Sequence, residues 1–385
     1  MKAFCLTNLG LEKISIDEIS KLIKIKNSKI TGSIISFDID SFKDLEKIYY
    51  YSQSIKRASL LLFETDISDD FSDIVEKLNK KISESNFNEF MKEKYRFKVE
   101  CIREGSHQFK SVDIVRNISK SIKDKYKQDT GKEILPVYKG ENISFLIYIN
   151  DSKCYFGIDF SSIDLSKRDY KIFNHNESMS PTIAYSLIKY AKVKKDSKIL
   201  DPFCGTGAIP IEAAVSFSNI PINKNKDFMF KNEKYYDDNL IIENNEISEE
   251  EKNIFAFDKE FRHIRNAIKN ATVAGVENKI EFKECAIKNI SKENYLDFFD
   301  FIITDPPIDS KKKSKETIRN LYKEFLNQSN SILKKKGRII LIVKLNSMIE
   351  EIIIESGFEI IDSILIYQGK EEKKILKLKK KNDIL

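Results

Sequence analysis

The stretch most able to do chemistry in this 385-residue sequence is a turn containing two glycines. Asp201 ends a short apolar strand, Gly205 and Gly207 follow in the turn, and a helical pattern begins directly after them. Glycine has no Cβ, so at these two positions the backbone can press against a ligand at the mouth of a parallel sheet. The simplest alternative is a tight strand-to-helix turn that binds nothing.

The residues after the turn exclude the two common phosphate-binding motifs. A P-loop needs Lys followed by Ser or Thr, where Ala208 and Ile209 stand. The dinucleotide fingerprint needs a third glycine where Pro210 stands. An acid such as Asp201 suits a cationic ligand better than an anionic one, and S-adenosylmethionine carries both a sulfonium and an ammonium group.

Two more acids end apolar strands farther along. Asp258 ends the run 255–258, where a carboxylate can accept two hydrogen bonds from a ribose diol; the alternative is a solvated acid at a strand end. Asp305, Pro306 and Pro307 end the run 301–307. An exocyclic amine is a poor nucleophile. A carboxylate and a backbone carbonyl fixed by proline can accept hydrogen bonds from its N–H groups and so direct its lone pair at the methyl group. These three are the candidate catalytic residues for methyl transfer to a nucleobase amine, and a structural turn is the alternative.

Composition bounds the class of protein. With 41% hydrophobic and 33% charged residues, the chain is typical of globular proteins and long enough for about two or three domains. No apolar run is long enough to span a membrane and no signal-peptide pattern is present, so we expect a cytoplasmic protein that does not bind membranes. The five cysteines are scattered, which argues against disulfides and a metal site. The net charge of +6 makes nucleic acid plausible without requiring it.

The elements that position these residues fall into three parts. Residues 1–63 are predicted to be a ferredoxin-like α+β domain, and residues 64–168 a second α/β module. The expected strands of these two parts are 4–6, 29–38, 58–63, 95–101 and a hairpin of 143–150 with 154–159; the expected helices are 12–22, 42–54, 68–83 and 113–127, and a turn is expected at 103–107.

After a polar linker at 169–179, residues 180–385 alternate strands and helices. Such alternation with apolar strands predicts a doubly wound, mostly parallel sheet. The expected strands are 198–202, 254–258, 279–283, 299–304 and 337–343, and the expected helices are 207–216, 260–274 and 315–334. A terminal hairpin of 358–368 with 374–378 adds antiparallel strands, and an Asn/Lys/Glu-rich insertion at 219–252 interrupts the alternation.

Residues 201–214, Asp-Pro-Phe-Cys-Gly-Thr-Gly-Ala-Ile-Pro-Ile-Glu-Ala-Ala, closely resemble the cofactor motif of THUMP-containing RNA guanine-N2 methyltransferases. Residues 167–170 followed by 180–184 are similar to the junction between the THUMP and catalytic domains of that family. Residues 96–117, with Arg-Glu-Gly-Ser-His at 103–107, resemble THUMP itself. The resemblance covers essentially the whole chain and is weakest in the first 60 residues.

This resemblance implies a Rossmann-like class I methyltransferase domain with a mostly parallel seven-stranded sheet, preceded by ferredoxin-like and THUMP modules. It implies S-adenosylmethionine as cofactor, RNA as partner, most often the acceptor end of tRNA, and no metal. The sequence does not identify protein partners, and a monomer is the simplest expectation. The implied cofactor-binding residues are Thr182, Asp201, Phe203, Gly205, Gly207, Asp258 and Cys285. The implied RNA-binding residues are Arg103, Lys110, Arg116, Lys120, Lys123 and Lys127, for which a solvated helix face is the alternative.

The sequence departs from the family pattern at two positions. The family has an aromatic after Pro-Pro that stacks on the target base, and Ile308 stands there, so Phe203 or an aromatic of the 219–252 insertion would have to replace it. The acid that faces the cofactor adenine aligns with Cys285, a weaker hydrogen-bond acceptor, beside Glu284. We expect N2-methylguanosine formation in tRNA; the alternatives are an rRNA methyltransferase and an RNA-binding scaffold without catalytic activity.

Overall fold

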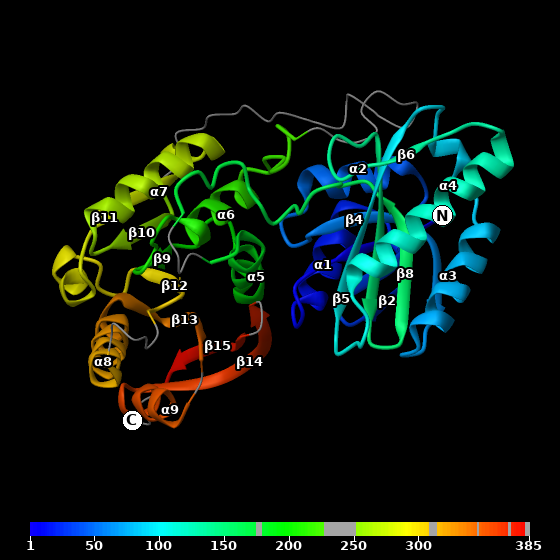
Figure 1. Cartoon of the computed structure of the whole chain (residues 1–385). Helices are drawn as coiled ribbons and strands as arrows, with labels where there is room; N and C mark the ends of the chain where they lie inside the picture. The colour runs from blue at the N-terminus through cyan, green and yellow to red at the C-terminus, as the bar shows by residue number, and fades with distance from the viewer. Residues whose placement is uncertain (175–178, 227–251, 308–313, 345, 369–370, 382–385) are drawn as a thin grey trace.

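The computed structural model describes all residues except 175–178, 227–251, 308–313, 345, 369–370 and 382–385. The chain forms two lobes, each built on a sheet, one of eight strands and one of seven (Figure 1). The predicted α/β fold class, with α+β modules before a mostly parallel sheet that ends in an antiparallel hairpin, is confirmed. Ile308 and most of the 219–252 insertion lie outside the described residues.

The N-terminal lobe begins with the expected ferredoxin-like alternation. Its elements are β1 (Lys2–Leu6), α1 (Glu12–Leu22), β2 (Lys26–Thr31), β3 (Ile34–Asp38), α2 (Phe42–Tyr51) and β4 (Arg57–Asp66). The second module adds α3 (Phe71–Glu84), η1 (Asn88–Phe90), β5 (Arg96–Glu104), α4 (Ser111–Thr130), β6 (Leu135–Pro136), β7 (Ile143–Asn150) and β8 (Lys153–Asp159). Local signals fix several ends: α2 begins at a capping box of Ser41 and Asp44, and α4 ends at Gly131 in a left-handed conformation.

The two modules share one sheet, in the order β2-β3-β1-β4-β8-β7-β5-β6. They join where β4 pairs antiparallel with β8, with Ser59 opposite Asp159. Alternate residues of a strand point to opposite faces. In β7, Phe145 and Ile147 accordingly enter the core shared with α1 to α4, whereas Tyr148 lies on the other face. The ferredoxin-like and second modules are therefore continuous through their backbone hydrogen bonds.

The C-terminal lobe holds the seven-stranded sheet, ordered β11-β10-β9-β12-β13-β15-β14. Its strands are β9 (Ile199–Asp201), β10 (Ile254–Asp258), β11 (Ile280–Glu284), β12 (Phe299–Thr304), β13 (Leu333–Val343), β14 (Phe358–Gln368) and β15 (Glu371–Lys380). The first five are parallel and the last two form the antiparallel hairpin. The chain order reverses between β9 and β12, which makes their carboxyl ends a topological switch point.

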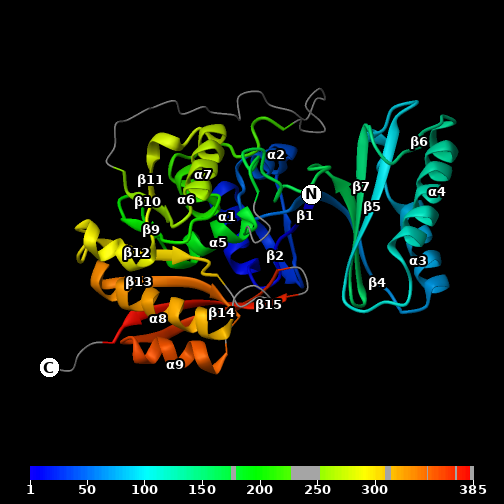
Figure 2. The ribbon, with the colours of Figure 1, turned by 60° about the vertical axis from the view of Figure 1, so that its left-hand side comes forward.

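Helices cover both faces of this sheet (Figure 2). One face carries α5 (Pro181–Ala191), α6 (Ala208–Phe217) and α7 (Phe261–Ala274), whose apolar residues share a core with β9 and β10. The other face carries α8 (Lys315–Ile332) and α9 (Ser347–Glu355), together with the 3-10 helix η4 (Ile287–Glu293). A further 3-10 helix, η3 (Glu277–Lys279), follows α7.

Some element bounds differ from the expectations. The turn expected at 103–107 starts later, because β5 continues to Glu104 and pairs there with Asn150 of β7. Strand β13 begins at Leu333 rather than at 337. Helix α9 and helix η4 were not predicted: the isoleucines of α9 do not distinguish a buried helix from a strand by periodicity alone.

The ferredoxin-like elements α1 and β1 lie between the C-terminal lobe and helices α3 and α4 (Figure 2). The turn after β1 makes a specific contact with the C-terminal lobe: Asn8 Nδ2 donates to Thr182 Oγ1 on α5 at 2.8 Å. Gly10, with φ +93°, packs so closely against β14 that an added Cβ would lie 2.0 Å from the Leu365 carbonyl oxygen. This turn is therefore shaped to fit the edge of the seven-stranded sheet.

A buried ion pair joins three segments at the centre of this junction. Arg168 Nε donates to Glu212 Oε1 on α6 at 2.9 Å, and both side chains are 0% exposed. Arg168 Nη1 and Nη2 donate to the carbonyls of Leu165 and Gln53, both at 2.6 Å, and Nη2 also donates to Glu212 Oε2 at 3.3 Å. Gln53 Nε2 and the Tyr170 hydroxyl complete the shell around the Glu212 carboxylate, at 2.6 and 2.8 Å. Each nitrogen of the guanidinium and each oxygen of the carboxylate thus has a hydrogen-bond partner, which offsets the cost of burying the two charges.

We expect Arg168→Ala to lower the free energy of unfolding by about 3 to 5 kcal/mol, because Glu212 would be left buried without a counter-charge. Urea unfolding followed by circular dichroism measures the change. Lys26→Ala, which breaks the exposed pair with Asp40, is the control and should cost less than about 1 kcal/mol. Equal effects of the two variants would contradict this account of the junction.

Candidate active site

The switch point gathers the three acids singled out from the sequence. Strand β9 pairs with β10 on one side, with Asp201 opposite Ala256, and with β12 on the other, with Leu200 opposite Ile302. Asp201 and Asp258 therefore end neighbouring strands, and Asp305 directly follows β12. Three carboxylates converge at one edge of the sheet.

The glycine turn needs the conformations that glycine allows. Gly205 and Gly207 have φ of +53° and +89°, which residues with a side chain rarely adopt. A Cβ built on Gly205 would meet no heavy atom within 4 Å, so that face of the turn is open to a ligand. A Cβ on Gly207 would lie 3.1 Å from Ala267 of α7, so this glycine allows close helix packing.

Asp201 is buried, and its carboxylate is held by its surroundings. Thr304 Oγ1 donates to Asp201 Oδ1 at 2.6 Å, and the Phe203 backbone N–H donates to the same oxygen at 3.2 Å. Burial raises the pKa of Asp201 to about 8, and the negative charges of Asp258 and Asp305 add to the rise. A cationic ligand here would be favoured by all three acids.

Asp258 braces the glycine turn from the neighbouring strand. Gly205 N–H donates to Asp258 Oδ2 at 3.0 Å, and Glu260 N–H donates to Oδ1 at 2.9 Å. His263 Nδ1 on α7 lies 3.1 Å from Oδ1. The side chain retains 11% exposure, and a carboxylate has about four acceptor sites, so a ribose hydroxyl can still be accommodated.

Thr304 and His263 belong to the site although sequence reasoning missed them. Only their closeness to the acids in the sequence could have indicated them: Thr304 precedes Asp305 at the strand end, and His263 follows Asp258 by five residues. Each orients an acid through its side chain, and that role depends on contacts between different elements.

The remaining predicted site residues surround these acids. Phe203 stacks edge-on with Phe325 of α8, with ring centroids 5.5 Å apart, so its ring also belongs to the core beneath the site. Pro306 is buried, whereas Asp305 and Pro307 are half-buried. Cys285 is buried after β11, and its backbone N–H donates to the Asp258 carbonyl at 2.9 Å.

Thr182 lies at the junction between lobes. It is buried in the first turn of α5, where its hydroxyl bonds Asn8 of the ferredoxin-like domain and lies 3.0 Å from Ser180 Oγ. A contact between Thr182 and the cofactor stays a prediction.

The predicted RNA-binding residues divide into two groups. Arg116, Lys120, Lys123 and Lys127 occur at helical spacing on one outer stripe of α4, opposite its buried isoleucines; Arg116, Lys120 and Lys127 are exposed, and Lys123 is half-buried. Lys127 forms an exposed ion pair with Glu133, and Lys110 is exposed just before the helix. Arg103 instead supports the loop, since its guanidinium donates to the Phe109 carbonyl and to Ser111 Oγ.

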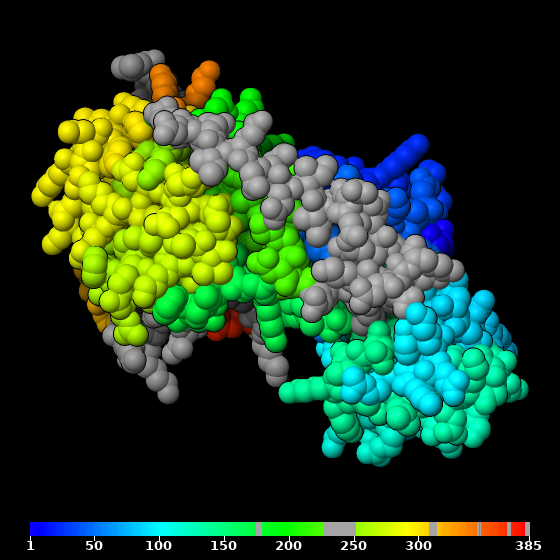
Figure 3. Space-filling view, turned by 90° about the horizontal axis from the view of Figure 1, so that it is seen from above, coloured from blue at the N-terminus to red at the C-terminus, as the bar shows by residue number. Residues whose placement is uncertain are grey.

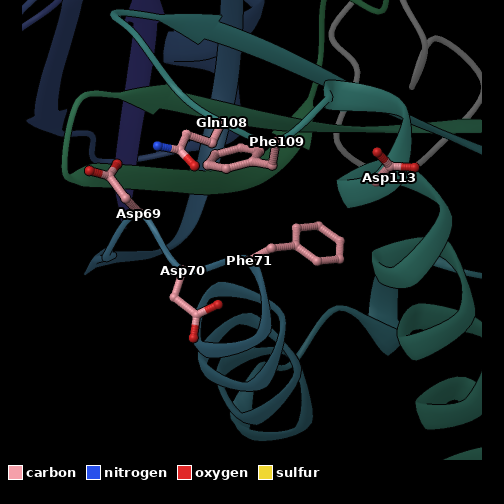
Figure 4. A pocket seen from close by; sticks show the side chains of 6 residues that line it. All are labelled: Asp69, Asp70, Phe71, Gln108, Phe109 and Asp113. Carbon is pink, nitrogen blue, oxygen red and sulfur yellow. The ribbon is translucent and has the colours of Figure 1, made fainter.

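A cavity of about 440 Å³ opens beside that loop, between the starts of α3 and α4 (Figure 4). Its lining residues are Asp69, Asp70, Phe71, Gln108, Phe109 and Asp113. Three acids make this cavity unsuitable for phosphate.

Neither a metal-binding cluster nor a membrane-spanning helix occurs among the described residues. No group of three or more His, Cys, Asp or Glu side chains there could hold a metal ion. Within the same residues, no helix is long and apolar enough to cross a membrane.

Comparison with known proteins identifies two families in this chain. The family model of the RMKL-like methyltransferase domain matches residues 168–373, and that of the THUMP domain matches residues 70–159. The chain belongs to the RMKL-like methyltransferase family. The methyltransferase part contains the glycine turn and all three acids, and the THUMP part contains α4.

Two relatives match nearly the whole chain, including the modules before the methyltransferase domain. The tRNA (guanine(6)-N2)-methyltransferase of Methanocaldococcus jannaschii is 31% identical over 94% of this chain and 95% of its own length. The enzyme of the same name from Archaeoglobus fulgidus is 26% identical over 91% of this chain and 85% of its own. The solved structure of SMU.472 complexed with SAH has the same fold, with a TM-score of 0.80 at 18% identity over 100% of this chain and 99% of that one.

The residues of the site fit S-adenosylmethionine, the methyl donor of this methyltransferase. The open face of Gly205 leaves room for close approach, and the buried acid Asp201 with its acidic neighbours favours a positively charged group. Asp201, Gly205, Gly207 and Asp258 would hold the cofactor, with Phe203 and Cys285 beside them.

The raised pKa of Asp201 predicts a pH-dependent cofactor affinity. Below about pH 8 this carboxyl is protonated in the free enzyme, whereas the ammonium group of a bound ligand favours the ionised form, so binding releases a proton. The affinity for S-adenosylhomocysteine should therefore rise with pH, by at most about tenfold per unit, and level off above about pH 8.

Calorimetry at several pH values, in buffers that differ in ionisation enthalpy, measures both the affinity and the proton release. Asp201→Asn should bind more weakly and lose the slope between pH 6 and 8. An equally steep slope in Asp201→Asn would assign the titration to another group.

Proposed function

We propose that this methyltransferase modifies tRNA, transferring a methyl group to the exocyclic N2 amine of guanine, with the guanine at position 6 as the target. The observation that carries the proposal is the match to two enzymes of that name across both lobes, including the modules ahead of the catalytic domain. A match confined to the catalytic domain would support the reaction type but not the RNA.

Asp305 is the residue proposed to prepare the amine. S-adenosylmethionine supplies the methyl group when bound. The Asp305 carboxylate and the Pro306 carbonyl accept the two N–H bonds of the guanine amine, which turns the nitrogen lone pair toward the donor. Pro307 lacks a backbone N–H, so it cannot compete locally for these acceptors. The contribution of the enzyme is therefore mainly one of position.

The target base has to leave its stack to reach this edge of the sheet. The THUMP part of the N-terminal lobe, drawn in cyan and teal, stands apart from the yellow part of the C-terminal lobe (Figure 3). An RNA held by α4 would therefore contact the protein at two separated places. We assign phosphate contacts to the basic stripe of α4 and place the acceptor end of tRNA on the THUMP domain.

The remaining assignments belong to the same proposal. The division is ferredoxin-like 1–63, THUMP 64–168, linker 169–179 and methyltransferase 180–385, with β4 crossing the first boundary. The enzyme acts as a monomer in the cytoplasm, without a metal.

Methylation of tRNA transcripts in vitro, followed by mass-spectrometric mapping, tests the substrate. N2-methylguanosine at position 6 is expected, and replacing that guanine by adenine should abolish incorporation. Methylation of rRNA fragments in place of tRNA would refute the proposal while leaving the cofactor site intact.

We expect Asp305→Ala to lower kcat by at least about 100-fold, because the amine loses the acceptor that orients it. The affinity for tRNA should stay within about threefold of wild type, since RNA binding does not depend on that bond. Single-turnover methylation and separate binding assays make the measurement. Retention of most of the turnover would remove Asp305 from its assigned role.

The double substitution Lys120→Ala and Lys123→Ala should weaken tRNA binding and lower the dependence of log Kd on log salt by about two, since each phosphate contact contributes about one. The matched control is Lys335→Ala with Lys336→Ala, two exposed lysines near the amino end of β13, away from the switch point. Equal losses in both double variants would indicate a general charge effect rather than a binding stripe.

A further inference from the structure

Asn270 lies on α7, and its side chain joins the linker to the glycine turn. It is 0% exposed. Its Nδ2 donates to the Thr206 carbonyl and to the Phe173 carbonyl, both at 3.0 Å, and its Oδ1 accepts from the Phe173 N–H at 3.0 Å. Both amide hydrogens and the amide oxygen are thus used, and only one orientation of the amide satisfies all three bonds.

The bond to Thr206 acts directly on the turn. Thr206 lies between Gly205 and Gly207, both in left-handed conformations, and its carbonyl belongs to the peptide that leads into Gly207. Two flexible glycines do not hold one conformation by themselves, because glycine loses more backbone freedom on folding than any other residue. Asn270 holds the middle of the turn from the side of α7, while Asp258 holds Gly205 from β10.

The bonds to Phe173 connect the same amide to the linker. Arg168 directly precedes this linker, and its partner Glu212 lies on α6, the helix that begins directly after the turn. The segment 168–173 is therefore anchored on both helices that flank the glycine turn. Lys269 adds an ammonium group 5.0 Å from the centre of the Phe173 ring.

We propose that Asn270 is a positioning residue for the cofactor: its amide keeps the glycine turn in its binding conformation and does so in concert with the docked linker. The proposal concerns cofactor binding and does not depend on the identity of the RNA substrate. Preorganised backbone is what lets a turn bind without a further ordering cost. Loss of the amide should therefore reduce cofactor affinity more than it reduces the rate of methyl transfer at saturation.

Asn270→Asp is the sharpest test, since it keeps the size and removes the N–H donors that bond both carbonyls. In the full-length chain we expect the Kd for S-adenosylhomocysteine, measured by calorimetry, to rise about tenfold or more. The KM for S-adenosylmethionine should rise in parallel, while kcat at saturating cofactor and the affinity for tRNA stay within about twofold. Asn278→Asp makes the same chemical change at an exposed position in η3 and should leave all four quantities unchanged.

A second variant keeps the proposal testable if Asn270→Asp does not fold. Phe173→Pro leaves α7 intact and removes the linker N–H that donates to Asn270, so it should raise the Kd in the same direction by a smaller factor. An unchanged Kd with a lowered melting temperature, in whichever variant folds, would make the role of Asn270 merely structural and overturn the proposal. A loss of kcat or tRNA affinity with an unchanged Kd would overturn it too.

Discussion

The arrangement of the two lobes depends on the buried ion pair between Arg168 and Glu212. A buried pair gives little net stability compared with well-packed apolar groups, but it tolerates only an arrangement that satisfies every donor and acceptor. Here the satisfying groups come from the ferredoxin-like domain, the linker and α6 at once. Because α6 begins directly after the glycine turn, the same pair that docks the N-terminal lobe fixes the helix that continues from this turn. Domain orientation and cofactor geometry thus share one constraint.

The carboxylates at the switch point lower the stability of the protein, and the same burial favours the binding of a cation. Burying Asp201 beside two other acids is unfavourable without a cation, and the raised pKa expresses that cost. Thr304, Phe203 and Gly205 offset part of it by donating hydrogen bonds to the acids. The site is therefore completed electrostatically by a positively charged ligand. A neutral pocket of the same shape would bind such a ligand less well and would discriminate less against anions.

Much of the fold, and the acids at the switch point, could be predicted from the sequence. The strands at 254–258 and 299–304 match to the residue, because short apolar runs bounded by turn residues identify buried strands. Helix α9 could not be predicted, since its isoleucine run fits helix and strand equally, and nothing local indicated that β4 and β8 would join two modules into one sheet. The basic stripe of α4 followed from helical spacing, whereas the structural use of Arg103 depended on a loop closing back on it.

The sequence by itself determined the glycine turn, the three acids at strand ends and the order of the elements, because backbone conformation and strand ends are governed by neighbouring residues. Only the tertiary structure decided which side chains hold these groups in place. Thr304 meets Asp201 across 103 residues of chain, Asn270 meets Thr206 across 64, and Arg168 meets Glu212 across 44. Such partners are chosen by the packing of elements and by the need of every buried polar group for a hydrogen bond, and neither is visible in a local pattern.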